Sequence, residues 1–132
     1  MNFVDSNIFI YYMASDPNYG KTAGKILERI ESGKENATTS TLVITQVASY
    51  LKWRKRSGAI SLFMDFLQSL PNLNKIETTF GDFVEMRRLQ KENSKDWDDL
   101  VIASQMRRLG IERIYSNDSD FDSFEGIERI FA

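Results

Sequence analysis

The sequence contains no histidine and no cysteine. Without cysteine the chain can form no disulfide, offers no thiolate to a metal and has no cysteine nucleophile. The absence of histidine excludes more chemistry, because imidazole is the usual general base, a member of the Ser-His-Asp triad and a common metal ligand. If the protein is an enzyme, its reaction must depend on carboxylates, lysines or a bound ion.

Long apolar runs are also missing. The longest, such as residues 8–13 and 100–103, are much shorter than the roughly 20 residues that a membrane-spanning helix needs. The first residues include Asp5 and no basic segment of the kind that begins a secretory signal. We therefore expect a cytoplasmic protein.

The composition is typical of a single globular domain, with 42% hydrophobic and 27% charged residues among 132. A chain of this length buries about two-thirds of its unfolded surface, which is enough for one core. We expect one domain spanning residues 1–132 and one functional site. The net charge of -2 does not exclude a nucleic-acid partner, because phosphate binding depends on how cations are distributed over the surface.

Short apolar strands alternate with segments of helical periodicity, which predicts an α/β fold with a mostly parallel sheet of four to five strands and helices on both faces. The expected strands are residues 2–5, 37–39, 73–76, 112–115 and 127–131. The expected helices are residues 7–12, 21–32, 41–57, 60–70, 80–92 and 97–109. Helical spacing places Arg54, Leu62 and Phe83 on inward faces. The expected helix ends include Ser6 or Asn7 as the first cap, Ser57-Gly58 and Asn93-Ser94.

Three aspartates stand where strands end or helices begin: Asp5, Asp99 and Asp118. Ligands of open α/β sheets bind outside the carboxyl ends of the strands, so Asp5 and Asp118 could share that crevice. Several carboxylates in one place repel one another, and a hard divalent cation with oxygen ligands resolves the repulsion. Taken singly, each aspartate is more often a cap or a turn former.

The motifs around these acids match a known family. Residues 3–7 (FVDSN) combine a strand, an acid, a small residue and an asparagine. Residues 99–103 (DLVIA) begin a helix that ends at Gly110, and residues 114–121 (IYSNDSDF) form a strand followed by a polar, acidic turn. In their order and spacing, these segments resemble PIN-domain proteins, in particular the ribonuclease toxins of VapC-like toxin-antitoxin pairs.

The resemblance implies a role for particular residues. Asp5, Asp99 and Asp118 match the family's catalytic, metal-binding acids, which would hold Mg²⁺ or Mn²⁺. Ser116 matches its hydroxyl position, and Asn7 matches the polar residue beside the first acid. The activity implied is endoribonucleolytic hydrolysis of RNA phosphodiester bonds. The resemblance also implies a homodimer and a cognate antitoxin protein that covers the acidic site.

One position departs from the family, which usually has glutamate where this chain has Gln46. Glutamine keeps an oxygen acceptor but loses a negative charge, so we expect weaker cation binding or compensation by a further acid. The candidates are Asp120, as a fourth metal ligand, Asp98 and Asp122. Asp98 is otherwise a solvated residue at a helix start, and Asp122 is otherwise a turn cap.

An acidic pocket needs flanking cations to hold RNA. Candidate phosphate contacts are Lys52, Arg54, Lys55 and Arg56, with Arg107 and Arg108 as a second group; a solvated helix face or a dimer rim would explain them equally well. Four aromatic residues could stack on bases: Tyr11, Tyr12, Tyr50 and Trp53. Core packing is the simpler interpretation of all four.

Two other functions fit the same residues. The first is a catalytically weakened PIN-like module that binds RNA or protein, with Gln46 marking the loss of activity. The second is a Mg²⁺-dependent phosphohydrolase or receiver-like domain that uses Asp5 as a nucleophile.

Overall fold

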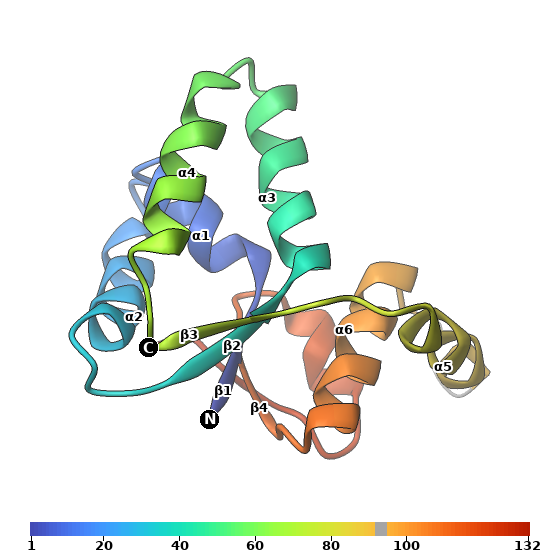
Figure 1. The fold of residues 1–132 in the computed structure, drawn as a ribbon. Coiled ribbons are helices and arrows are strands. Elements are labelled where there is room, and N and C mark those ends of the chain that lie inside the picture. Colours follow the sequence, from blue (N-terminus) through green and yellow to red (C-terminus); the bar gives the residue numbers. More distant parts are fainter. Residues whose placement is uncertain (92–94) are drawn as a thin grey trace.

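The computed structural model describes residues 1–91 and 95–132 (Figure 1). Its strands are β1 (Asn2–Val4), β2 (Ala37–Ser40), β3 (Leu73–Ile76), β4 (Arg113–Tyr115) and β5 (Glu128–Ile130). Its α-helices are α1 (Ser6–Met13), α2 (Gly20–Glu31), α3 (Thr41–Trp53), α4 (Gly58–Gln68), α5 (Phe80–Gln90) and α6 (Trp97–Leu109). A short 3₁₀ helix, η1 (Ser119–Ser123), which the sequence did not predict, follows β4.

The five strands form one parallel sheet in the order β3-β2-β1-β4-β5, which confirms the predicted α/β class. The chain builds the sheet outward from β1 in one direction through β2 and β3, and then in the other through β4 and β5. The order therefore reverses between β1 and β4, which are paired directly with Val4 opposite Tyr115. Such a reversal opens a crevice at the carboxyl ends of the two strands.

The core forms because apolar side chains of the short strands and of the helices meet on both faces of the sheet. Phe3 and Val4 of the central strand β1 are fully buried. Leu27 of α2 and Met106 of α6 are at most 1% exposed. Figure 1 shows α1 and α2 on one side of the sheet and α5 and α6 on the other. None of the helices in the described part of the chain is both long and apolar enough to cross a membrane.

Helices α3 and α4 form a hairpin that projects beyond the carboxyl ends of the strands, with its connecting turn at the far end (Figure 1). This arrangement explains three wrong predictions. Helix α3 ends at Trp53 instead of near Ser57-Gly58, and Arg54 is exposed in the turn. Leu62 is 64% exposed, because a projecting helix has fewer neighbours to cover it.

Two further predictions about helix faces and ends were wrong. Phe83 is 37% exposed, since α5 packs mainly against α6 and only part of its surface is covered. The cap of α1 is neither Ser6 nor Asn7: Asp5 precedes the helix and accepts a hydrogen bond from the Ser6 amide at 2.8 Å. The predicted helix end at Asn93-Ser94 lies outside the described residues.

A buried carboxylate joins α5 to α6. Asp82 is 2% exposed and forms a capping box with Thr79 at the start of α5. Arg108 of α6 donates from Nε and Nη2 to its two oxygens at 2.8 and 3.0 Å. Burial alone would raise the pKa of Asp82, but hydrogen bonds from Arg108, Thr79 and Gln105 outweigh burial and lower it. Arg108 is therefore engaged in the fold rather than free to contact RNA.

Replacing Asp82 with alanine should lower the free energy of unfolding by about 2–3 kcal/mol, because it removes the acceptor of the Thr79 amide in the capping box, the partner of Arg108 and one of the two partners of the Gln105 amide. Urea denaturation followed by circular dichroism measures this. Glu85→Ala is the matched control, since the ion pair of Glu85 within the described residues is with the exposed Arg88 on the same helix, and such pairs contribute little. Equal unfolding midpoints for the two variants would contradict the structural role of Asp82.

Candidate metal centre

The crevice between β1 and β4 brings together the acids from the two ends of the sequence. Asp5 follows β1 directly, and Ser116 follows β4, which lies beside it. The Asp5 backbone amide donates to the Tyr115 carbonyl at 3.0 Å and the Ser116 amide donates to Ile130, so the sheet pairing continues to the edge of the crevice. The position of both side chains is thus fixed by the rigid sheet.

Hydrogen bonds hold the Asp5 carboxylate from several sides. The Ser116 hydroxyl donates to Asp5 Oδ2 at 2.7 Å, the Asn7 amide donates to the same oxygen at 3.2 Å, and the Ser6 amide donates to Oδ1. Asn7 also donates to Ser116 Oγ at 3.1 Å, which closes a triangle of side chains. The resemblance had singled out Asn7 and Ser116, and the structure places both against Asp5.

Asp5 is 4% exposed, and its environment disfavours its charge. The pKa of Asp5 is raised to about 6, mainly by burial and in smaller part by the negative charges of Asp118 and Asp98. The hydrogen bonds from Ser116 and Ser6 act in the opposite direction and limit the increase. The carboxylate therefore lies in a place that favours a nearby positive charge.

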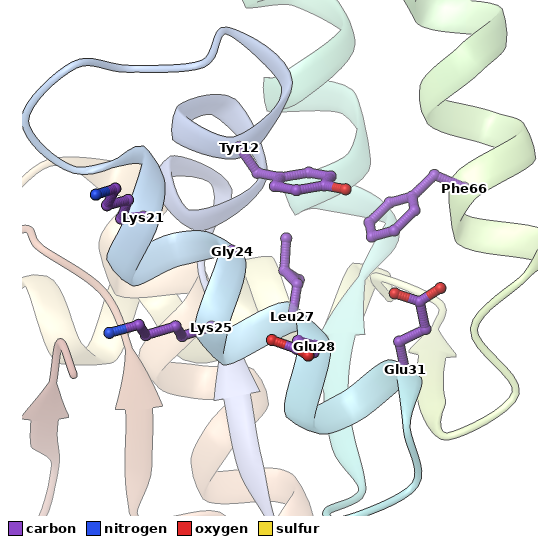
Figure 2. Close-up of a pocket in the computed structure, with 8 residues that line it drawn as sticks. All are labelled: Tyr12, Lys21, Gly24, Lys25, Leu27, Glu28, Glu31 and Phe66. Atoms are coloured by element: carbon purple, nitrogen blue, oxygen red, sulfur yellow. The ribbon is translucent and has the colours of Figure 1, made fainter.

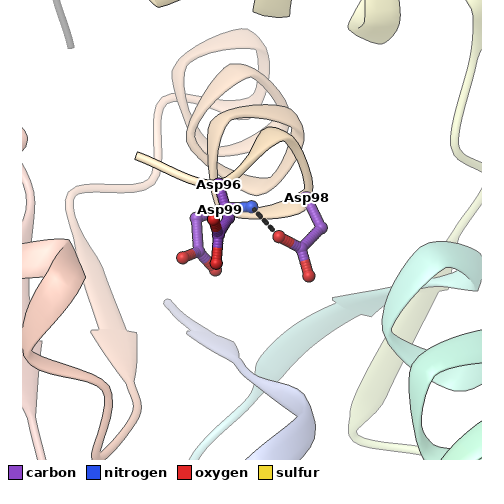
Figure 3. A group of neighbouring side chains, drawn as sticks. All are labelled: Asp96, Asp98 and Asp99. Carbon is purple, nitrogen blue, oxygen red and sulfur yellow. Dashed lines mark hydrogen bonds between the residues drawn. The ribbon is translucent and has the colours of Figure 1, made fainter. Parts of the chain in front are cut away.

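The start of α6 brings a second set of acids to the crevice. Figure 3 shows Asp96, Asp98 and Asp99 at this helix end, with the Asp99 backbone amide donating to Asp98 Oδ1 at 3.0 Å. Asp99 is 7% exposed. Its burial, and then the charges of the other aspartates, Asp98 first and Asp118 and Asp5 after it, raise the pKa of Asp99 to about 8.

Asp118 and Asp120 come from the turn after β4, where η1 begins. The Asp118 amide donates to Ser116 Oγ at 3.0 Å, and Asp118 Oδ1 accepts from the Asp120 amide at 2.9 Å. Both aspartates are partly exposed, and Asp120 forms an ion pair with Lys95 at 3.5 Å. Ser116 thus touches both Asp5 and Asp118.

Carboxylate oxygens of Asp99, Asp118 and Asp120 approach one another within 4.8 Å, and so do those of Asp96, Asp98 and Asp99. Asp99 belongs to both groups. The two groups could each hold a metal ion, and their ligands are all oxygens, as Mg²⁺ and Mn²⁺ prefer. The raised pKa values of Asp5 and Asp99 point to the same conclusion, because burial and then the neighbouring acids disfavour their negative charge, and a bound cation would offset both effects.

Gln46 lies on α3 at the side of these acids. Its amide Nε2 donates to Asp98 Oδ2 at 2.9 Å, while its buried Oε1 has no hydrogen-bond partner among the described residues. The amide therefore compensates for the missing carboxylate by removing repulsion from Asp98 rather than by supplying an anionic ligand. An unpaired buried oxygen next to an acidic crevice also fits a site that accepts a cation.

Two residues of the crevice were not predicted from the sequence. Asp96 precedes α6 and joins Asp98 and Asp99, but it lies three positions before the matched motif, at a place that carries no pattern of its own. Ser40, at the end of β2 beside β1, is fully buried and its Oγ has no partner among the residues described. Asp122, in contrast, is exposed and bound to Arg129, outside the crevice.

The aromatic candidates fall into two groups. Tyr11 and Tyr50 are partly buried against the core, as the core interpretation predicted. The Tyr12 ring packs with Phe66 but is 42% exposed, so core packing was the wrong prediction for it. Tyr12 also borders a hollow of about 630 Å³ over α2, whose lining includes none of the candidate metal-site acids (Figure 2). Core packing was also the wrong prediction for Trp53, whose side chain is 73% exposed.

The geometry defines a class of protein: a single parallel α/β sheet with a cluster of carboxylates that could hold a cation, in a chain without histidine or cysteine, where the strand order reverses between β1 and β4. The family model of the PIN domain matches residues 3–127. The chain therefore belongs to the PIN-domain family.

Individual relatives agree with this assignment. The chain is 28% identical over 131 residues to Ribonuclease VapC13 of Mycobacterium tuberculosis, covering 98% of this chain and 99% of the relative. Its fold is similar to that of the Sarcin-Ricin loop cleaving toxin VapC20 of the same organism, with a TM-score of 0.78, 17% identity and coverage of 96% and 98%. It also resembles VapBC2 from Rickettsia felis, solved bound to a DNA fragment from its promoter, with a TM-score of 0.73, 16% identity and coverage of 98% and 96%.

Proposed function

We propose that this protein is a Mg²⁺- or Mn²⁺-dependent endoribonuclease and the toxin of a toxin-antitoxin pair. The observation that carries the proposal is the convergence of Asp5, Asp99 and Asp118 at the switch point, where two of them have pKa values well above the ordinary value for aspartate. The full-length similarity to a protein named as a VapC ribonuclease supports the choice of RNA as the substrate.

Asp5, Asp99, Asp118 and Asp120 would hold the cation. When bound, such a cation lowers the pKa of a water molecule and stabilises charge on the scissile phosphate, which a histidine-free pocket cannot do with its own side chains. Ser116 fixes the orientation of Asp5 by its hydrogen bond and receives the Asp118 amide. Asn7 completes this support from α1, and Gln46 orients Asp98.

The geometry is less suited to a nucleophilic aspartate. Both oxygens of Asp5 already accept hydrogen bonds, and the side chain is 4% exposed, whereas a nucleophile must reach the phosphorus atom directly. We therefore assign Asp5 to cation binding, within a single domain of residues 1–132.

The proposal extends to partners and location. We infer a cognate antitoxin, since one structure of similar fold is VapBC2 from Rickettsia felis and another is a toxin-antitoxin complex from Klebsiella pneumoniae. We infer a cytoplasmic homodimer from the resemblance to VapC-like toxins. Lys52, Arg54, Lys55 and Arg56 are the proposed RNA contacts. All four are exposed around the turn of the α3–α4 hairpin.

Purified protein should cleave single-stranded or structured RNA in Mg²⁺ or Mn²⁺ and lose that activity in excess EDTA, because a pocket of carboxylates has no positive charge of its own to stabilise the phosphate and the leaving oxygen. Gel analysis of end-labelled RNA measures the cleavage, and adding Mn²⁺ back should restore it. Asp118→Asn protein purified in parallel controls for contaminating nucleases. Cleavage that persists in EDTA, or a phospho-aspartate trapped at Asp5, would contradict the proposed chemistry.

A further inference from the structure

The turn of the α3–α4 hairpin combines an exposed indole with a cluster of cations. Trp53, the last residue of α3, is 73% exposed. Its neighbours Lys52, Arg54, Lys55 and Arg56 are all exposed. We call these five residues the hairpin tip. Figure 1 shows this turn at the far end of the hairpin, away from the sheet.

The cations of the hairpin tip form no ion pair within the described part of the chain. Across the described residues, the side chains of Lys52, Lys55 and Arg56 have no hydrogen bond or ion pair to an acid. The Arg54 guanidinium lies over the Trp53 ring, 5.8 Å from its centre, and the centre of the Tyr50 ring lies 6.1 Å from the centre of the Trp53 ring. Even with these two neighbours the Trp53 side chain is 73% exposed, so part of the indole surface is open to solvent.

The helix connects this tip to the acidic crevice. Gln46, which contacts Asp98, and Trp53 are seven positions apart on α3. Two turns of an α-helix take about 7.2 residues, so the two side chains lie on nearly the same face. The rise of 1.5 Å per residue places them about 10 Å apart along the helix axis. A chain bound in the crevice could therefore follow this face to the hairpin tip.

We propose that the hairpin tip binds single-stranded RNA, with an unpaired base stacked on Trp53 and the flanking phosphates contacted by Lys52, Arg54, Lys55 and Arg56. This inference rests on the proposed ribonuclease function. An aromatic ring surrounded by cations is the combination that single-stranded nucleic acid recognises, because every base has a face to stack and every nucleotide has a phosphate. A paired strand offers no free base for the indole, so an unpaired segment is selected.

The stacking part of the inference is tested with a fluorescein-labelled single-stranded RNA in EDTA, where no metal-dependent cleavage occurs, by fluorescence anisotropy. Trp53→Ala should weaken binding about 5- to 100-fold, and Trp53→Phe should lose much less, since a ring remains. Phe80→Ala is the matched control: Phe80 is an exposed aromatic residue on α5, 83% exposed, and its loss should leave the affinity unchanged. Unfolding temperatures should not differ, because both rings are mostly in solvent.

The charge part is tested by the salt dependence of the same binding. Lys55→Gln/Arg56→Gln should reduce the slope of log affinity against log salt by about 1.4, because each contact to a single strand contributes about 0.7. Lys21→Gln/Lys25→Gln removes the same charge from exposed positions of α2 and should leave the slope unchanged. Equal slopes for the two double variants would overturn the phosphate contacts.

The outcomes separate this inference from the proposed function. If the wild type cleaves RNA in Mn²⁺ but Trp53→Ala binds RNA as tightly as the wild type in EDTA, the inference is overturned. The hairpin tip would then be a surface for a protein partner and not an RNA site. A wild type that does not bind the RNA in EDTA would overturn the inference equally. Binding that depends on Trp53 without any cleavage would support the hairpin tip as an RNA site and count against the catalytic proposal alone.

Discussion

Asp5→Asn should reduce metal-dependent RNA cleavage on the order of 1000-fold or more, because it removes one of the proposed anionic ligands of the cation site. The substitution conserves size, and an asparagine oxygen can still accept the hydrogen bond from the Ser6 amide. Initial rates of RNA cleavage in saturating Mn²⁺ measure the effect. Asp118→Asn should behave in the same way.

Asp122→Asn is the matched control for this loss. It makes the same chemical change only four positions after Asp118, but Asp122 is exposed and bound to Arg129 outside the crevice. Its cleavage rate should equal that of the wild type. A wild-type rate in Asp5→Asn or Asp118→Asn would remove these residues from the proposed site.

The loss of activity should not come from loss of structure. The folded-state pKa values of Asp5 and Asp99, about 6 and about 8, lie above the ordinary value of 3.8. A carboxyl group with a raised pKa contributes stability below its unfolded pKa and loses it as the pH rises through its folded pKa. The melting temperature of the metal-free wild type should therefore fall between pH 5 and pH 8. The melting temperature of Asp5→Asn should fall by less over the same range. Thermal unfolding in EDTA at both pH values measures this.

The sequence predicted the sheet and the position of the site because both depend on local patterns. Short apolar segments alternating with helical periodicity require a parallel sheet, and acids that follow its strands must lie at one edge. Asp5 and Ser116 accordingly meet across the β1–β4 pair. The family resemblance added Asp99, whose position on a helix gave no indication of which strand it would approach.

What the sequence could not give depends on contacts between distant segments. Leu62 and Phe83 satisfy the helical pattern of core residues, yet their exposure is decided by whether another element covers α4 and α5. The hydrogen bond from Gln46 to Asp98 joins residues 52 positions apart, and no local pattern indicates it. Trp53 was assigned to the core because of its place in a helical pattern of aromatic residues, whereas the projecting hairpin places it in solvent.

Gln46→Glu should raise the affinity for Mn²⁺ about tenfold, equivalent to about 1.4 kcal/mol. In the wild type the Gln46 amide donates to Asp98 at 2.9 Å, so the pair is stable without a cation. Glutamate would replace this donor with a second carboxylate, and the resulting repulsion is relieved only when a cation binds. Isothermal titration calorimetry measures the affinity, and thermal unfolding in EDTA should show a lower melting temperature for the variant. Gln68→Glu adds the same charge on an exposed face of α4 and should change neither the Mn²⁺ affinity nor the melting temperature in EDTA.

The double variant Gln46→Glu/Asp98→Asn determines whether the gain in Mn²⁺ affinity depends on the contact between residues 46 and 98. Asparagine at position 98 can donate to the new glutamate, which restores a hydrogen bond without a cation and removes the added repulsion. The metal-free melting temperature should then return close to the wild-type value, and the gain in Mn²⁺ affinity should largely disappear. Two residues in direct contact give such non-additive effects, whereas independent residues give additive ones. Additive changes would mean that Gln46 influences the cation site by general electrostatics, and that its hydrogen bond to Asp98 does not set the affinity.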